Sequence, residues 1–269
     1  MTDREWRLIR EETLPGPEAM AYDEAAARTA AEGGPRTVRI YRWRPSTLSL
    51  GYRQATDSVD WDACERAGVD VVRRNTGGGG IYHDTYGDIS YSIVAPAEEV
   101  PGDLLETYEQ FCEPLFDAFA ALGVDARFVG EERPAIHEPA CYLRALHPAH
   151  DIVAGDGRKL SGNAQYRRQD AVIQHGSITF RAEPERHVDC FATDTVTPAD
   201  FSARVTGLHE QSPDTTRREV VRTLEDALAD WAGATEGAWT DEEVAFAERR
   251  GDEKYRSEAW NRDREDPTA

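Results

Sequence analysis

Lysine is almost absent from this sequence of 269 residues: Lys159 and Lys254 are the only two, against 29 arginines. Acidic residues outnumber basic ones by 51 to 31, which gives a formal net charge of -20. Such a surface repels phosphates and anionic headgroups, so we expect no nucleic acid and no membrane among its partners. Abundant carboxylates with little lysine are typical of adaptation to concentrated salt, and we expect a halophilic source. In such a chain, a lysine that is kept should have a task that arginine cannot perform.

Long apolar runs, paired cysteines and targeting signals are missing as well. No uninterrupted apolar run is long enough to cross a bilayer. The first twelve residues lack the basic-then-apolar pattern of a signal peptide, so we expect a cytoplasmic protein. The four cysteines lie far apart without CxxC spacing, which argues against a structural zinc site and a disulfide framework. His137, His147 and His150 have no zinc-like partners beside them in the sequence, and we expect no metal ligation.

Apolar periodicity indicates an α+β protein with a mixed sheet, because strand-like and helix-like segments do not alternate regularly. The proline- and histidine-rich residues 130–150 are expected to form an irregular loop. We expect one catalytic domain over residues 1–235 and a short, acidic, helical segment over residues 236–269. The expected helices cover residues 17–31, 60–67, 104–122, 217–231 and 240–249, and the expected strands cover 37–43, 48–52, 69–73, 89–94, 151–153 with 159–160, and 171–180.

The first segment that could carry chemistry is RRNTGGGGIYHD, residues 73–84. Consecutive glycines let the backbone approach a ligand closely and present its N–H groups to an anion. Arg73 and Arg74, just before the glycines, could add bidentate contacts to a phosphate or carboxylate. The segment matches neither a Walker loop nor GxGxxG. The simpler interpretation is a glycine-rich hairpin with both arginines solvated.

Two further segments follow, GRKLSGNAQ with Lys159 and QHGS with His175. A lysine beside a small-residue turn could extend into a pocket as a mobile point charge for a phosphate or carbonyl oxygen. We expect the Lys159 side chain to reach its site from the surface and to contribute little to packing. Its alternative is a surface lysine beside a β-turn. For His175, in a predicted strand, the alternative is a hydrogen-bonded histidine of the core.

In this order the three segments resemble the lipoate–protein ligase A family, within the superfamily of biotin/lipoate ligases and octanoyltransferases. The family pattern is RR.TGGG..YHD, then K(I/L).G.A, then a strand that bears a histidine. The likeness extends to MAYDEA at residues 20–25, to segments within residues 40–54 and to KYRSEAWN at residues 254–261. This resemblance implies an α+β catalytic domain with a bent mixed β-sheet and flanking helices.

The resemblance also implies a reaction. The ligases use ATP and Mg²⁺ to convert lipoate, or octanoate, to an acyl-AMP. They then acylate one lysine of an acceptor domain, either the E2 subunit of a 2-oxoacid dehydrogenase complex or the H protein of glycine cleavage. Some need a small separate accessory protein. Lys159 would be the catalytic residue, because it would contact both the carboxyl group and the α-phosphate. The positions that match the nucleotide- and lipoate-binding residues are Arg74, Gly77, Gly78, Gly79, Gly80, Ile81, Tyr82, His83, Asp84, Lys159, Gly162, Ala164 and His175.

The main alternative within the superfamily is an octanoyltransferase, which moves octanoyl from acyl-carrier protein through a cysteine thioester. Cys141 lies eighteen positions before Lys159, near where that nucleophile would fall. Lys159, His147 or His150 would then be its activating neighbour. The transferase branch commonly has arginine where this chain has Gly79, so the sequence favours the ligase and leaves Cys141 as a small buried side chain. A biotin–protein ligase fits the first motif less well, and a non-catalytic binding protein of the same fold would not explain the retained lysine.

Overall fold

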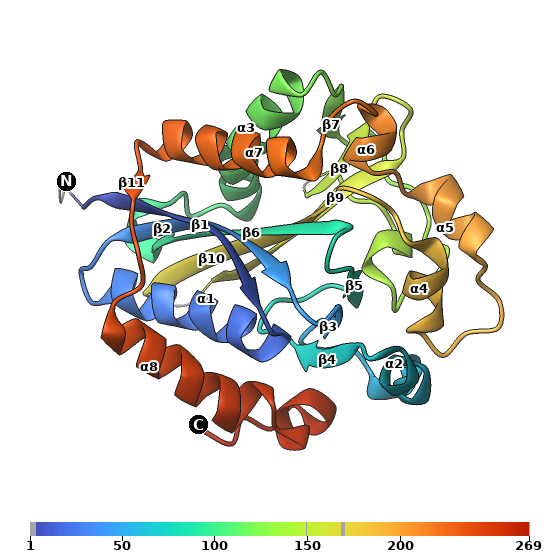
Figure 1. The fold of residues 1–269 in the computed structure, drawn as a ribbon, viewed down its shortest axis with the longest axis horizontal. Coiled ribbons are helices and arrows are strands. Elements are labelled where there is room, and N and C mark those ends of the chain that lie inside the picture. The colour runs from blue at the N-terminus through green and yellow to red at the C-terminus, as the bar shows by residue number, and fades with distance from the viewer. Residues whose placement is uncertain (1–3, 149, 168–169, 269) are drawn as a thin grey trace.

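The computed structural model describes residues 4–148, 150–167 and 170–268. Within these residues a mixed sheet of eight strands forms the centre, in the order β11-β1-β2-β6-β10-β9-β8-β7 (Figure 1). β1 runs parallel to β11 and β2, and the other neighbours are antiparallel. The strands are β1 (Trp6–Leu14), β2 (Arg36–Trp43), β6 (Asp88–Pro96), β7 (Ala126–Phe128), β8 (Asp151–Ala154), β9 (Lys159–Arg167), β10 (Ala171–Thr179) and β11 (Thr235–Glu236). The expected α+β class with a mixed sheet is confirmed.

A second, three-stranded sheet has the order β4-β3-β5. Its strands are β3 (Thr47–Leu50), β4 (Asp70–Arg73) and β5 (Ile81–His83), with β3 parallel to β4 and antiparallel to β5. The glycine-rich segment of residues 73–84 therefore begins at the end of β4 and ends just after β5. Sequence patterns gave no sign of β5, because a three-residue strand is too short for periodicity to reveal.

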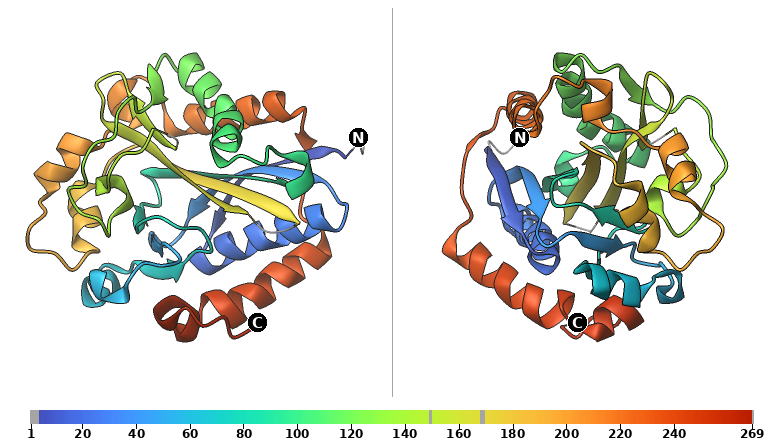
Figure 2. Two further views of the ribbon diagram at one scale, coloured as in Figure 1. Left: turned by 180° about the vertical axis from the view of Figure 1, so that it is seen from behind. Right: turned by 45° about the vertical axis from the view of Figure 1, so that its right-hand side comes forward.

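Helices cover both faces of the large sheet (Figures 1 and 2). One face packs against α1 (Gly16–Ala31), and α8 (Asp241–Arg250) lies over α1. Alanines at the buried positions of α1 let the backbone come close to the strands. The other face is covered by α3 (Leu104–Ala121) and α7 (Arg217–Ala232). The short helices are α2 (Trp61–Ala67), α4 (Pro184–Asp189), α5 (Pro198–Arg204) and α6 (Leu208–Gln211).

The C-terminal residues continue the same packed structure. The expected boundary between residues 235 and 236 falls inside β11, which pairs with β1. After α8 the chain forms two π-helical turns, Gly251–Tyr255 beside α1 and Ala259–Asp263 beside β4. None of the helices in the described part of the chain is both long and apolar enough to span a bilayer.

The periodicity of α3 provides a test of the core. Phe119 is fully buried in the main apolar cluster, whereas Leu104, at the start of the same helix, is half exposed. We expect Phe119→Ala to lower the free energy of unfolding by about 3–5 kcal/mol, because it leaves a cavity. Leu104→Ala should change it by less than about 0.5 kcal/mol. Urea unfolding of both variants checks this, and equal effects would contradict the assigned register of α3.

Candidate active site

A cavity of about 380 Å³ lies between the two sheets and the loop of residues 130–150. Strands β2, β6, β9 and β10 of the large sheet contribute to its wall, together with β3 and β5 of the small one. Its lining includes ten of the residues expected from the sequence: Arg74, Gly77, Gly78, Ile81, His83, Cys141, Lys159, Gly162, Ala164 and His175. Three segments far apart in the sequence thus meet in one place.

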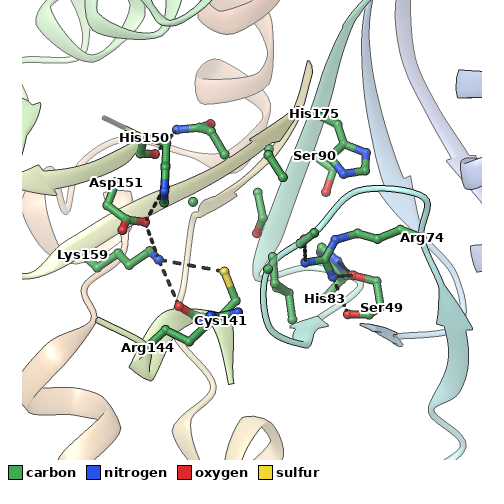
Figure 3. Close-up of a pocket in the computed structure, with 18 of the residues that line it drawn as sticks. Ser49, Arg74, His83, Ser90, Cys141, Arg144, His150, Asp151, Lys159 and His175 are labelled. Carbon is green, nitrogen blue, oxygen red and sulfur yellow. Dashed lines mark hydrogen bonds and ion pairs between the residues drawn. The ribbon is translucent and has the colours of Figure 1, made fainter. Parts of the chain in front are cut away.

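Lys159, Asp151 and Cys141 lie together on one side of this cavity, across from Arg74, His83 and His175 (Figure 3). Lys159 Nζ lies 2.6 Å from Asp151 Oδ1 and 3.9 Å from Cys141 Sγ, and it donates a hydrogen bond to the Cys141 carbonyl oxygen at 3.1 Å. Asp151 opens β8 and Lys159 opens β9, so the hairpin between these strands brings the pair together. The ammonium therefore connects a carboxylate to a thiol.

The burial of Lys159 corrects an expectation. Only 1% of the residue is exposed, so it is not a mobile lysine reaching in from the surface. Burial alone lowers the pKa of Lys159, but the charge of Asp151, with a smaller contribution from Cys141, outweighs it and the pKa lies above its ordinary value. For Asp151, burial acts to raise the pKa, but the Lys159 charge holds it well below its usual range. Both groups are therefore charged at neutral pH.

Cys141 is held by backbone contacts to the glycine segment. It opens a single 3₁₀ turn, Cys141–Leu143. Its N–H donates to the Gly80 carbonyl oxygen at 2.8 Å, and the Gly80 N–H donates to Pro139 O at 2.7 Å. A side chain at Gly162 would come within 3.4 Å of both Cys141 Sγ and Lys159 Nζ, so the missing side chain leaves room for the thiol and the ammonium.

Arg74 is buried and holds the glycine loop rather than facing solvent. Its Nε donates to Thr76 Oγ1 at 3.0 Å, and its Nη1 donates to Ser49 O at 2.8 Å and to Ser49 Oγ at 3.3 Å. Its Nη2 donates to Gly77 O at 2.7 Å and to Gly79 O at 2.8 Å. All five N–H groups thus have an oxygen partner. Burial lowers the pKa of Arg74 to about 10.

Arg73 is buried too, so the interpretation of two solvated arginines is wrong. Its Nη1 donates to the carbonyl oxygens of Gly51, Tyr52 and Gln54 at 2.9–3.0 Å. Its Nε and Nη2 donate to Asn261 O at 3.1 and 2.9 Å. The arginine pair therefore organises the loops around the cavity from within.

Two of the histidines that line the cavity, His175 and His83, have hydrogen-bond partners on their rings. His175 Nε2 lies 2.7 Å from Thr76 Oγ1, and Nδ1 lies 3.1 Å from Asp23 Oδ2. Burial lowers the pKa of His175, so the ring favours its neutral form. His175 is thus a buried, hydrogen-bonded residue that also lines the cavity, and its expected ligand-binding role stays a prediction. His83 Nε2 lies 2.8 Å from Ser49 Oγ, and its ring stacks on another aromatic ring of the wall.

Four expected residues do not line the cavity. Asp84 accepts hydrogen bonds from the backbone N–H groups of Tyr86 and Gly87 and so closes the turn after β5. The Tyr82 hydroxyl donates to Asp84 at 3.2 Å, away from the cavity. Gly79 and Gly80 lie behind it, where a side chain on Gly79 would collide with the segment that carries Cys141. These four residues shape the site but do not face it.

The loop histidines are placed beside Asp151 rather than beside the thiol. His150 Nδ1 lies 3.7 Å from Asp151 Oδ1, and the His147 and His150 rings stack 5.1 Å apart. Lys159 is therefore the basic group in contact with Cys141. In the described part of the chain, no group of three or more His, Cys, Asp and Glu residues could hold a metal ion.

Sequence reasoning missed Asp151, Asp23 and Ser49. Asp151 was predicted only as the start of a strand. A carboxylate eight positions before a rare lysine, at the start of the preceding predicted strand, was the signal that could have identified it. No sequence signal connects Asp23 in α1 to a histidine in β10 that lies 152 positions away.

Known proteins resemble this chain in sequence and in structure. The family model described as lipoyl protein ligase A/B catalytic domain matches residues 15–229. An octanoyltransferase LipM of Exiguobacterium sp. is 32% identical over 276 residues, which covers 97% of this chain and 99% of that protein. Another, from Symbiobacterium thermophilum, is 41% identical over 181 residues, which covers 64% of each. The crystal structure of a lipoate-protein ligase A bound with ATP has a TM-score of 0.80 and 26% identity, and it covers 96% of this chain and 98% of that one.

The buried ion pair predicts how substitutions affect stability. Lys159→Met should lower the free energy of unfolding by about 3–5 kcal/mol, because it leaves a buried carboxylate without its cation. A neutral-pair variant (Asp151→Asn with Lys159→Met) should recover most of that loss. Urea unfolding of the three proteins at pH 7 checks this. A Lys159→Met variant as stable as wild type would contradict the pairing of Lys159 with Asp151.

The same pair predicts a pH dependence. The pKa of Asp151 is lower in the folded protein than in the unfolded chain, where it is about 4. The stability that the ionised carboxylate contributes is therefore complete above about pH 4 and is lost as the pH falls through the folded pKa. The excess stability of wild type over the neutral-pair variant should therefore shrink as the pH falls below about 4. Unfolding midpoints measured from pH 7 to pH 2 check the sign, and a constant difference would contradict it.

Proposed function

Because the chain belongs to the lipoyl protein ligase A/B catalytic domain family, we propose that it is an octanoyltransferase. It would move an octanoyl group from acyl-carrier protein to a lysine of a lipoyl acceptor domain, through a thioester on Cys141. The observation that carries this proposal is the contact of 3.9 Å between Cys141 Sγ and the buried ammonium of Lys159. The naming of both relatives as octanoyltransferases supports it.

In the first half of the reaction, the Cys141 thiolate attacks the carbonyl carbon of the donor thioester. A positive charge beside a thiol favours the thiolate, which is the nucleophilic form. A carbon–sulfur bond forms to Cys141, and the bond to the carrier's sulfur breaks. Lys159 gives a proton to the departing carrier thiolate and becomes neutral. Asp151 keeps the Lys159 side chain in place beside the reacting sulfur atoms.

In the second half, the neutral amine of the acceptor lysine attacks the acyl-enzyme. A carbon–nitrogen bond forms, the thiolate of Cys141 leaves, and the neutral amine of Lys159 takes the proton released by the attacking nitrogen. The site returns to its starting pair of thiolate and ammonium. Lys159 thus serves first as the acid and then as the base. In both steps the protein contributes mainly by positioning the reacting atoms, and no cofactor is needed.

The cavity suits a medium-length acyl chain. Met20, Tyr41, Trp43, Ile81 and Leu146 give its wall a large apolar surface. The burial of an apolar chain against such side chains supplies binding energy along its length. Acceptor lysines of E2 subunits or of the H protein would enter at the end that holds the thiol. An accessory protein is not required by this chemistry.

A second candidate is the ATP-dependent lipoate ligase that the sequence favoured. The similarity to an ATP-bound lipoate-protein ligase A supports it. In this structure, however, the Arg74 guanidinium directs every N–H group to a protein oxygen, and the Gly80 N–H bonds to Pro139. These groups are thus already bonded within the protein, which favours the transferase, and we route no step through ATP or Mg²⁺.

The donor requirement separates the two functions. We expect purified enzyme to modify an acceptor domain from octanoyl-acyl-carrier protein at the same rate with and without ATP and Mg²⁺. Free octanoate or lipoate with ATP and Mg²⁺ should give less than about 1% of that rate. Mass spectrometry of the acceptor measures both. Modification only from the free acid with ATP would replace the transferase with the ligase.

The two central side chains give a further test. Cys141→Ala should lower transfer by more than about 1000-fold, because it removes the atom that carries the acyl group. Cys112→Ala, which removes a buried thiol from α3, should retain transfer within about threefold. The neutral-pair variant should fold and lose transfer by more than about 100-fold. Transfer by Cys141→Ala near the wild-type rate would overturn the thioester route.

A further inference from the structure

The C-terminal segment Lys254–Asn261 (KYRSEAWN) lies against the base of the glycine loop, about 180 positions away in the sequence. Figure 1 shows the last turns of the chain beside β4, the strand that leads into that loop. The transfer chemistry proposed above uses none of these residues.

Two residues of the segment hold the backbone and guanidinium of Arg73. The Arg73 N–H donates to Asn261 Oδ1 at 2.7 Å, and its guanidinium donates to Asn261 O. In return, Trp260 Nε1 donates to Arg73 O at 2.7 Å. Both polar groups of one backbone residue are thus satisfied by the C-terminal segment, which fixes the end of β4.

Two more residues hold Asn75. The amide nitrogen of Asn75 donates to Glu24 Oε1 and to the Tyr255 hydroxyl, each at 2.8 Å. The amide oxygen of Asn75 accepts from Lys254 Nζ at 3.0 Å. The Tyr255 hydroxyl in turn contacts the same Glu24 carboxylate. All these groups, apart from the half-buried Asn75, are buried, so these bonds are little weakened by water.

Lys254 is the second of the two lysines of the chain, and its geometry explains why arginine is absent there. Its Nζ, in a residue that is 3% exposed, lies 2.9 Å from Glu24 Oε1, 3.0 Å from Asn75 Oδ1 and 3.1 Å from Asp266 Oδ2. It also lies 4.0 Å from the centre of the Trp260 ring. A compact ammonium can direct its donors at three acceptors around one point, whereas a planar guanidinium cannot.

From Asn75 the connection to the nucleophile is short. Arg74, the residue before Asn75, holds Gly77 and Gly79, and Gly80 forms the backbone bridge to the segment of Cys141. We infer that Lys254 and Tyr255 are positioning residues, which hold the glycine loop so that the Cys141 thiol stays in contact with Lys159. This inference rests on the proposed function in one respect: it assumes that Lys159 activates Cys141.

The test measures that activation directly, without an acyl donor. The rate of Cys141 alkylation by iodoacetamide at pH 7 is compared between a protein that has the Asp151–Lys159 pair and one that carries the neutral-pair substitutions. The ratio of the two rates reports how strongly Lys159 acts on the thiol. Both proteins of each ratio carry the same further substitution, so a change in the access of the reagent to Cys141 affects both rates and cancels in the ratio. Peptide mapping assigns alkylation to Cys141 rather than to the three buried cysteines.

The ratio is measured in four backgrounds: wild type, Tyr255→Phe, Lys254→Met and Arg256→Ala. Tyr255→Phe removes one oxygen from the contact with Asn75 and keeps the ring. Arg256→Ala is the matched control, because Arg256 joins the same segment to Glu18 and Asp252 and does not contact the glycine loop. Thermal unfolding identifies any background that is not folded at the assay temperature, and Tyr255→Phe carries the test if Lys254→Met is one of them.

We expect a ratio of at least about 10 in wild type and in Arg256→Ala, and a fall to about 3 or less in Tyr255→Phe and Lys254→Met. A displacement of the reacting atoms by about 1 Å is enough for such a loss. An undiminished ratio in Tyr255→Phe and Lys254→Met would overturn the positioning role, and so would an equal fall in Arg256→Ala. A ratio near one in wild type would instead contradict the activation of Cys141 by Lys159, and with it the proposed function.

Discussion

The buried ion pair between Lys159 and Asp151 is the constraint on which the site depends. A lone ammonium would lose its proton or leave such a position, because burial disfavours charge. The carboxylate at 2.6 Å keeps the charge in place, and the short hairpin between β8 and β9 fixes the distance between them. On its other side, the Lys159 ammonium contacts the carbonyl oxygen and the thiol of Cys141. The ammonium charge of Lys159 thus lies next to Cys141, which is only partly buried, whereas the other three cysteines are buried.

The loops around the cavity are held by arginine rather than lysine. Arg73 and Arg74 direct their planar groups at backbone carbonyl oxygens of several loops, a task for which five donors in a fixed arrangement are suited. Lysine occurs where an ammonium faces several oxygens around a single point, at Lys159 and Lys254. This division explains why a chain with 29 arginines retains two lysines, and both are buried.

The sequence predicted the α+β fold, most helices and strands, and ten of the cavity residues, because long periodic segments and a dense motif leave strong signals. It did not predict β1 or the strand β5, since one mixes charged with apolar residues and the other is three residues long. It did not show which side chains point into the cavity: Asp84 and Tyr82 match the motif, but their side chains bond to each other outside the cavity. The burial of Lys159 depends on Asp151, a contact across a hairpin that sequence periodicity does not report. Adaptation to concentrated salt stays a prediction.

The proposed transfer requires Cys141 to carry the acyl group. Its most direct test is to mix the enzyme with octanoyl-acyl-carrier protein, without nucleotide or acceptor, and to stop the reaction in acid. Intact-mass spectrometry should show one octanoyl group per chain, labile to hydroxylamine and located on Cys141. Addition of the acceptor domain should discharge it at least as fast as the overall reaction. An enzyme that remains unmodified while it forms an acyl-adenylate from free acid and ATP would contradict the account.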